Sequence, residues 1–415
     1  MTVNKHILAS QLAGETIGDG LVVLPGQGNS LAAESDSGIV LLDAGTARHF
    51  PRMIAALRAV TDQPVHAIVY SHGHLGYNGA VDVWDAHNRE RGEPAPRRIA
   101  HRNLPRRYAR YRETHELQAR MAAMQFPTRR TVAETMADLP MHDPTEVFDD
   151  TLTITANGRR VDVAHAPSEV DDALALWLPD DGLLAAGAAA PGSTIPNIGT
   201  PLRTQRLTIR WAETLERLAA LGAERLLTEF GPLVEGGEAV RRWLTATADA
   251  LRWLRAEVVR RMNAGMSERE ILADMSYPPE LFDQRWMRPT YGAPDYIVRD
   301  LYREENGWWD RNPTTLHPAG PDAAAAAVRS AIDPARVLAR AQELADAGEP
   351  QLAMHVIDLI AAGPADAPLA LEARQLKAEL CRRLAESTPA YVSRALYRTS
   401  ANLLEQGETS WTALK

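Results

Sequence analysis

The sequence changes character at about residue 235, and this change constrains the fold more than any other feature. Before it, short runs rich in β-branched residues alternate with segments whose apolar residues recur at helical spacing. After it, the strand patterns stop and helical patterns continue to the end of the chain. We therefore predict an α/β fold for residues 1–235 and an all-helical region for residues 236–415.

Within the first region, individual elements are predicted from apolar spacing and turn signals. The spacing of Met53, Ile54 and Leu57 indicates a helix, and the pair Asn157-Gly158 indicates a hairpin turn. The strands are predicted at residues 20–24, 38–43, 65–70, 151–155, 160–164, 173–178, 183–186 and 225–228, and the helices at residues 51–60 and 208–221.

The second region carries local signals of the same kind. Ser267, followed three residues later by Glu270, predicts a capping box at the start of a helix. Residues 307–318, which include Trp308 and Trp309, are predicted to form a loop that packs between helices or across a dimer interface. Helices are predicted at residues 238–264, at residues 267–275 and from residue 323 onward, where residues 339–361 followed by 367–384 resemble one helix–turn–helix unit.

Composition excludes several classes of protein. The 415 residues include 45 basic and 54 acidic side chains, a formal net charge of −9, which argues against nucleic acid as the main partner. Cys381 is the only cysteine, so an intrachain disulfide and a cysteine-ligated structural zinc are excluded. No secretory signal and no apolar run long enough for a membrane span are visible. We therefore expect a cytoplasmic protein with no membrane span.

Two histidines, His72 and His74, follow directly after the predicted strand at residues 65–70. At this spacing after a strand, two imidazoles can point at one cation, and zinc and iron favour such ligands. Taken alone, the pattern is equally compatible with structural histidines, because histidine is common in polar loops.

The residues around this loop carry a resemblance that extends over most of the chain. Residues 26–30 (Gly-Gln-Gly-Asn-Ser) and 42–45 (Leu-Asp-Ala-Gly) precede the histidines. This order resembles the N-terminal half of the metallo-β-lactamase superfamily, whose loop normally reads His-x-His-x-Asp-His. Residues 277–281 (Tyr-Pro-Pro-Glu-Leu) and 307–313 (Gly-Trp-Trp-Asp-Arg-Asn-Pro) are similar to the dimerisation domain of its alkyl sulfatases. The resemblance implies an αββα sandwich with a metal site at one sheet edge, followed by an all-helical dimerisation domain, and hence a homodimer.

Carried over residue by residue, the resemblance implies His72, His74 and Glu169 as metal ligands. The positions of four further family ligands hold side chains that bind metals poorly or not at all, namely Gly76, Tyr77, Gly187 and Phe230. The remaining set of two histidines and one carboxylate can hold one zinc ion with an open position, or a non-haem Fe(II). We therefore expect one divalent metal, zinc before iron or manganese.

Other residues are candidates for catalysis or substrate binding. Glu229, beside the lost histidine position, is a fourth ligand or a general base. Tyr77 either donates to a developing negative charge or a leaving oxygen, or it simply fills the emptied space. The resemblance puts Asn197 and Arg203 near an anionic substrate, which a guanidinium suits, although Arg203 is equally interpreted as a surface arginine. His165 either orients the carboxylate ligand or is a structural histidine at a strand end.

Seven arginines between residues 97 and 112 form the dense basic run of the sequence. Three interpretations remain open. The run is a solvated helix face, an anion-attracting rim of the active-site mouth, or a nucleic-acid contact.

Three functions also remain open from the sequence. The first is a metal-dependent hydrolase resembling alkyl sulfatases, which cleaves a sulfate or related ester of a small anionic substrate with a metal-activated water at a mononuclear site. The second is a mononuclear enzyme of other chemistry, either Fe(II) with O2 or a metal-assisted lyase or isomerase. The third is a non-catalytic dimeric scaffold with a decayed metal site. The survival of His72, His74 and Glu169 together argues against the third.

Overall fold

The chain forms two compact units. The computed structural model describes residues 8–126, 133–134, 140–155, 158–364, 367–411 and 414. One unit comprises residues 1–115 and 136–305, and the other comprises residues 116–135 and 306–415. The predicted domain boundary at residue 235 stays a prediction, because compactness in space does not by itself define a domain.

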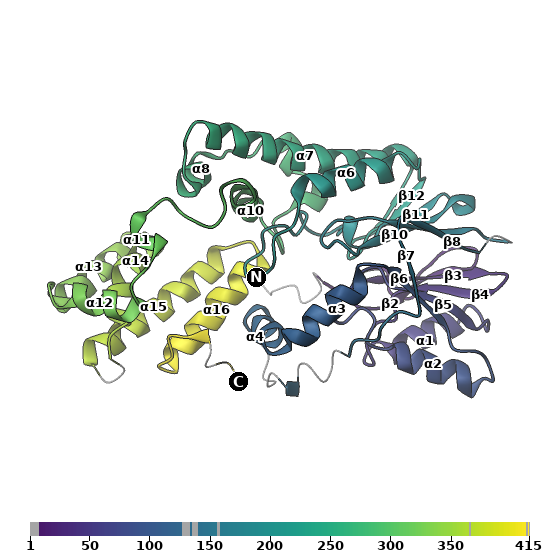
Figure 1. The fold of residues 1–415 in the computed structure, drawn as a ribbon, viewed down its shortest axis with the longest axis horizontal. Coiled ribbons are helices and arrows are strands. Elements are labelled where there is room, and N and C mark those ends of the chain that lie inside the picture. Colours follow the sequence, from purple (N-terminus) through teal and green to yellow (C-terminus); the bar gives the residue numbers. More distant parts are fainter. Residues whose placement is uncertain are drawn as a thin grey trace. The chain divides into compact units, whose positions relative to one another are not determined.

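The first unit begins with a seven-stranded sheet whose strands follow the order of the sequence (Figure 1). Strands β1 to β4 pair antiparallel, and β4 to β7 pair parallel. Parallel neighbours need crossover connections, which helices supply here. The strands are β1 (Thr16–Gly18), β2 (Leu21–Pro25), β3 (Asn29–Ser35), β4 (Gly38–Leu42), β5 (Val65–Val69), β6 (Arg97–His101) and β7 (Glu146–Phe148), and the helices are α1 (Phe50–Arg58), α2 (Val81–Glu90) and α3 (Leu104–Glu113).

The second sheet has six strands in the order β13-β12-β11-β10-β9-β8. Its neighbours are antiparallel except for β11 and β12, which are parallel and are connected through α6. The strands are β8 (Thr151–Thr155), β9 (Val161–His165), β10 (Leu174–Leu178), β11 (Leu183–Ala185), β12 (Arg225–Leu227) and β13 (Leu233–Glu235), and the helices are α6 (Thr208–Ala219), α7 (Gly237–Asn263), α8 (Glu268–Asp274), α9 (Pro279–Phe282) and α10 (Pro294–Asn306).

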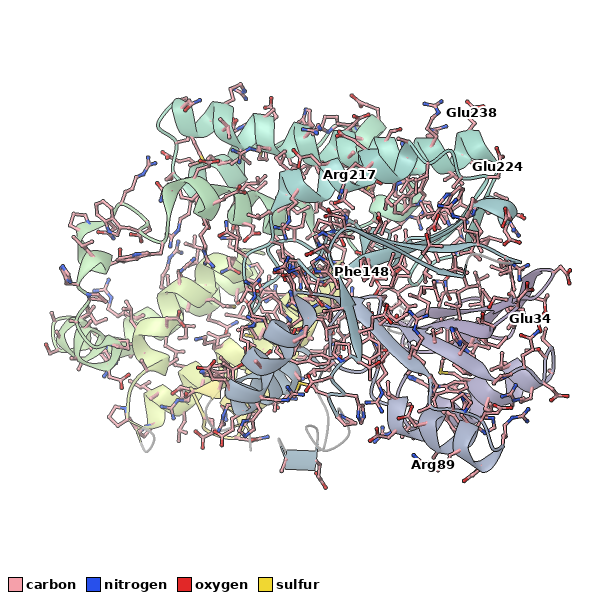
Figure 2. All side chains as sticks on the ribbon, turned by 45° about the vertical axis from the view of Figure 1, so that its right-hand side comes forward. Glu34, Arg89, Phe148, Arg217, Glu224 and Glu238 are labelled. Carbon is pink, nitrogen blue, oxygen red and sulfur yellow. The ribbon has the colours of Figure 1, made fainter. Side chains whose placement is uncertain are left out.

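Alternating apolar residues on the strands produce four layers. On β2, Leu21 lies in a core between the two sheets, whereas its neighbour Val22 lies in a second core that α1 and α2 cover. Helices α6, α7 and α10 pack on a third core, on the outer face of the second sheet. The two helical layers are visible below and above the sheets in Figure 1, and Figure 2 shows Arg89 and Glu238 projecting outward from α2 and α7. This αββα arrangement confirms the predicted fold class.

The second unit is helical. Helices α13, α14 and α15 share a core that includes Leu344, Ile357 and Leu380, and α16 packs on α15 through Leu404 and Cys381. None of the helices in the described residues combines the length and the apolar composition that a membrane span requires. The helices are α4 (His115–Gln125), α11 (Pro313–Leu316), α12 (Pro321–Arg329), α13 (Pro334–Asp346), α14 (Pro350–Ala361), α15 (Pro368–Ser387) and α16 (Tyr391–Glu405).

The structure corrects two predictions of local structure and confirms others. Residues 339–361, predicted as one helix, belong to α13 and α14, because Gly348 adopts a φ of 84° and Pro350 begins the next helix. The predicted loop at residues 307–318 contains the short helix α11. The capping box at the start of α8 is present, and β8 and β9 form the predicted hairpin, although Asn157 in its turn lies outside the described residues.

We expect the core between the two sheets to stabilise the first unit. Leu176 on β10 is buried there, so Leu176→Ala is expected to lower the free energy of unfolding by about 2–5 kcal/mol. Leu221→Ala, at a leucine that is 38% exposed, is the matched control and is expected to change it by less than about 0.5 kcal/mol. Urea denaturation followed by tryptophan fluorescence measures both. Equal effects of the two substitutions would contradict the assigned core.

Candidate metal centre

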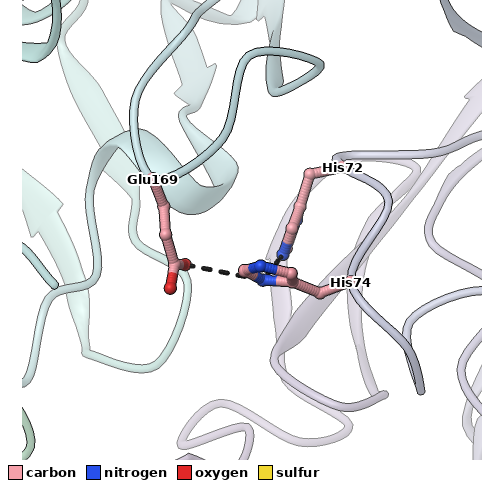
Figure 3. A group of neighbouring side chains, drawn as sticks. All are labelled: His72, His74 and Glu169. Carbon is pink, nitrogen blue, oxygen red and sulfur yellow. Dashed lines mark hydrogen bonds and ion pairs between the residues drawn. The ribbon is translucent and has the colours of Figure 1, made fainter. Parts of the chain in front are cut away.

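The two sheets each contribute to a cluster of three potential metal ligands. His72 and His74 lie in the loop between β5 and α2, and Glu169 lies in the loop between β9 and β10 (Figure 3). His72 Nε2 and His74 Nδ1 are 3.0 Å apart, and His74 Nδ1 is 3.7 Å from Glu169 Oε2. One ligand atom from each of the three residues lies within 4.8 Å of the other two. The tertiary structure therefore brings the three predicted ligands together.

The loop that carries His72 and His74 is held in place by the ion pair between Arg107 and Asp172. The backbone N–H of Gly73 donates to Asp172 Oδ2 at 2.6 Å, and the guanidinium of Arg107 on α3 pairs with the same carboxylate. Ser71 Oγ lies 2.9 Å from Nδ1 of His72 and so orients this ring with Nε2 toward His74. Contacts of this kind fix the ligand nitrogen of a metal-binding histidine.

The two oxygens of Glu169 have different surroundings. Oε1 accepts a hydrogen bond from Asn197 Nδ2 at 2.6 Å and pairs with Arg206 Nη1 at 2.8 Å. Oε2 faces His74. Since Oε1 is already occupied by two donors, Oε2 is the oxygen that can face a cation.

The protonation states of the histidines suit a cation. Burial, followed by the charge of His74, lowers the pKa of His72 well below its usual value, and burial, followed by the charge of Arg206, does the same for His74. Both imidazoles are therefore neutral at neutral pH and keep lone pairs for a metal. The donor set of two neutral imidazoles and one carboxylate fits a divalent ion such as zinc. That these residues bind the ion stays a prediction.

Tyr77 and Glu229 form a second buried group beside the histidines. Tyr77 donates to Glu229 Oε1 at 2.5 Å, and its ring centroid lies 4.2 Å from that of His72. Burial, followed by the charge of Glu169, raises the pKa of Glu229 well above its usual range. An enclosed space of about 10 Å³, roughly the size of one water molecule, lies beside this pair and is bordered by Asp43, whose pKa burial raises to about 6.

Gly187 also borders this enclosed space, where the resemblance expects an acidic ligand. Its φ is 51°, and a Cβ atom built there would lie 3.1 Å from the carbonyl oxygen of Leu174. Glycine relieves both constraints, because it adopts positive φ without a steric penalty. The backbone conformation at this position therefore favours glycine over any residue with a side chain.

The two residues predicted to bind the substrate, Asn197 and Arg203, make different contacts. Asn197 contacts Glu169 directly, whereas Arg203 donates to the Leu202 carbonyl at 3.3 Å. The charge of Arg203 still contributes to the lowered pKa of His74, after burial and the charges of Arg206 and Arg107.

The structure favours a structural role for His165. His165 Nε2 lies 2.9 Å from the carbonyl oxygen of Asp171, and its ring stacks on His101 at a centroid distance of 3.7 Å. It ends β9, as a structural histidine at a strand end would.

Sequence analysis missed three residues that support the site, namely Arg107, Asp172 and Arg206. Arg107 was recognised only as one of the basic run, and Arg206 lies three residues after Arg203. No local pattern distinguishes the arginine that reaches Glu169 from its neighbour, because the choice depends on how the loop before α6 folds.

Comparison with known proteins identifies the family. Residues 23–229 match the family described as Metallo-beta-lactamase superfamily, and residues 267–407 match the one described as Alkyl sulfatase dimerisation. The chain is an alkyl sulfatase-like member of the metallo-β-lactamase superfamily. The family resemblance predicted from the sequence is thus confirmed.

Two relatives of this chain are alkylsulfatases. A linear primary-alkylsulfatase of Pseudomonas sp. (strain ATCC 19151) is 27% identical over 306 residues, which cover 69% of this chain and 57% of the relative. An (R)-specific secondary-alkylsulfatase of Pseudomonas sp. is 26% identical over 413 residues, which cover 91% of this chain and 60% of the relative. The chain thus spans about three fifths of the length of these relatives.

A solved structure shares the fold. The stereoselective inverting sec-alkylsulfatase of Pseudomonas sp. superposes with a TM-score of 0.80 at 23% identity, covering 94% of this chain and 65% of that one. At this identity, the likeness establishes the fold and leaves the chemistry to be argued from the site.

The ligand cluster predicts metal binding that depends on His74. We expect the wild-type protein to hold about one zinc ion per chain, and His74→Ala to weaken zinc binding by about 100-fold or more because one of three ligands is lost. Elemental mass spectrometry of dialysed protein and competition with a fluorescent chelator measure this. His115→Ala, at an exposed histidine outside the cluster, is the control and should retain the metal. Unchanged zinc affinity in His74→Ala would contradict the assigned ligand set.

Proposed function

We propose that the protein is a metal-dependent hydrolase that cleaves a sulfate or related ester at a site with a single divalent ion. The observation that carries the proposal is the convergence of His72, His74 and Glu169 in a chain of the alkyl sulfatase-like family. When bound, a divalent ion supplies Lewis acidity, which stabilises negative charge that develops on oxygen. Zinc is the ion that this donor set favours first, with iron or manganese as the alternatives.

The number of ligands supports one ion rather than two. The positions that would complete a second site hold Gly76, Tyr77, Gly187 and Phe230, and none of these offers a carboxylate or an imidazole. Tyr77 and Glu229 instead bond to each other.

The buried pair supplies a proton in this proposal. The raised pKa of Glu229 favours the protonated form of its carboxyl group, which accepts a hydrogen bond from the Tyr77 hydroxyl, and the Tyr77 ring lies beside the His72 ring. Tyr77 is the group that donates to the leaving oxygen of the ester, and Glu229 returns the proton to Tyr77. General acid assistance of this kind contributes about 10²–10⁴-fold to a rate.

Two residues of the loop before α6 act at the site in this proposal: Arg203 binds the anionic end of the substrate, and Asn197 orients Glu169. Asn197 holds the Glu169 carboxylate, so that its second oxygen stays directed at His74 and would be available to a bound ion. Arg203 lies near enough to act electrostatically on His74 and Glu169, and a guanidinium forms bidentate hydrogen bonds with an oxyanion.

A panel of esters tests the hydrolase. Zinc-loaded protein is expected to release inorganic sulfate from a medium-chain alkyl sulfate. Tyr77→Phe should lower kcat by about 100-fold with the zinc content unchanged, because only the proton donor is lost. Tyr70→Phe is the matched control, since the Tyr70 hydroxyl is buried without a hydrogen-bond partner among the described residues. The proposal fails if metal-loaded protein turns over no sulfate, phosphate or carboxylic ester. Iron in the purified protein and substrate-dependent O2 consumption would favour oxygen chemistry instead.

We further propose that the protein is a homodimer. Residues 267–407 match an alkyl sulfatase dimerisation domain, and within them Trp308 is 73% exposed and Leu316 is 42% exposed. Large apolar side chains, and tryptophan in particular, are enriched in protein interfaces.

Light scattering coupled to size-exclusion chromatography tests the dimer. We expect twice the mass of one 45.5 kDa chain at micromolar concentration. Trp308→Ala should shift the equilibrium toward the monomer if this exposed ring lies in the interface. A mass of one chain for the wild-type protein would contradict the proposal.

A further inference from the structure

A cleft lined mainly by polar and charged residues lies in the first unit and borders the candidate metal centre. It has a volume of about 440 Å³ and is formed by residues of α3, of the loop between β9 and β10, and of the segment that leads into α6. Glu169 and Arg206 belong to its lining, so the cleft adjoins the carboxylate whose second oxygen faces His74. A molecule in the cleft would therefore lie next to the metal centre.

The lining of the cleft is strongly cationic. Glu169 and Asp171 are its two carboxylates among the described residues, and the apolar members are Val170 and Leu207. Five guanidinium groups stand against these two carboxylates, contributed by Arg106, Arg107, Arg110, Arg206 and Arg210. The cleft thus carries an excess of positive charge.

Three of these arginines form an ion pair with a carboxylate of the cleft, and among the described residues the other two do not. Arg106 and Arg107 pair with Asp171, and Arg206 pairs with Glu169. Arg110 and Arg210 have no carboxylate partner among the residues that the structure describes. The guanidinium of Arg110 instead lies 5.2 Å from the centroid of the Tyr111 ring.

The chemistry of this lining argues against a long alkyl chain as its occupant. An alkyl chain is stabilised by about 0.8 kcal/mol for each CH2 group moved from water into an apolar environment. Here, such a chain would desolvate guanidinium groups without replacing their hydrogen bonds, which costs free energy. A carboxylate or another oxyanion replaces these hydrogen bonds with charge-assisted ones, and arginine is the side chain best suited to do so in bidentate geometry.

We infer that the cleft binds an anionic group of the substrate, and that the substrate is a compact polar ester with a second anionic group rather than a long-chain alkyl sulfate. That the bound molecule is a substrate rests on the proposed hydrolase function. The anion site itself rests only on the lining of the cleft. Arg110 and Arg210 are the specificity-determining residues, and Arg107 is a positioning residue because it also holds Asp172 beneath the histidine loop.

Binding of a small dicarboxylate tests the anion site without any turnover. Titration calorimetry of zinc-loaded protein with succinate should detect binding. Arg110→Gln and Arg210→Gln should each raise the Kd by about 10-fold, the loss expected for one charge-assisted hydrogen-bonding partner. Arg242→Gln, at an exposed arginine of α7 that does not line the cleft, is the matched control and should leave the Kd unchanged. Absence of succinate binding, or equal Kd values in all variants, overturns the anion site.

Matched pairs of esters test the substrate class. We expect kcat/KM for ω-carboxyalkyl sulfates of three to six carbons to exceed that for alkyl sulfates of the same length by about 10-fold. The preference should be lost in Arg110→Gln and Arg210→Gln through a higher KM. Faster turnover of longer uncharged alkyl chains overturns the assignment of substrate class. Succinate binding without turnover of any ester would support the anion site and contradict the proposed hydrolase. Turnover without succinate binding would support the hydrolase and contradict the anion site.

Discussion

The ion pair between Arg107 and Asp172 is the interaction on which the candidate site depends. Arg107 comes from a helix beside the first sheet, and the buried Asp172 precedes a strand of the second sheet and accepts a hydrogen bond from Gly73 in the histidine loop. One carboxylate thus ties together the segments that carry His72 and Glu169. A buried pair of this kind tolerates the loss of neither partner, because the remaining charge would be left unpaired.

The interior beside the histidines is closely packed rather than hollow. The resemblance places metal ligands at Tyr77 and Gly187. Tyr77 bonds to Glu229, which lies beside a further such position, and Gly187 holds a backbone conformation with positive φ. The space that remains between them is about the size of one water molecule. This close packing is compatible with the intact sandwich fold, and Tyr77 connects Glu229 to the His72 ring.

The basic run on and before α3 shows why charge counts in a sequence leave function open. Arg97, Arg98, Arg102 and Arg112 each pair with a carboxylate of the first unit. The opposite charges of such a pair largely cancel at a distance, so the pair attracts a charged ligand only weakly. Arg110 instead faces the cleft beside the metal centre. The members of this run therefore differ in their surroundings, since some form ion pairs and Arg110 lines the cleft.

Local patterns in the sequence predicted the elements and the histidine pair, and the resemblance to the family added the αββα layers. The elements and the histidine pair depend on residues close in the chain: the period-two burial on β2, the capping box of α8, and the spacing of His72 and His74 after a strand. The resemblance added Glu169 to this set. Only the tertiary structure decided that Arg206 rather than Arg203 pairs with Glu169, that Asp172 supports the loop, and which arginines remain uncompensated. These contacts join segments tens of residues apart, where a shift of a few ångströms changes the partner and no local periodicity records the choice.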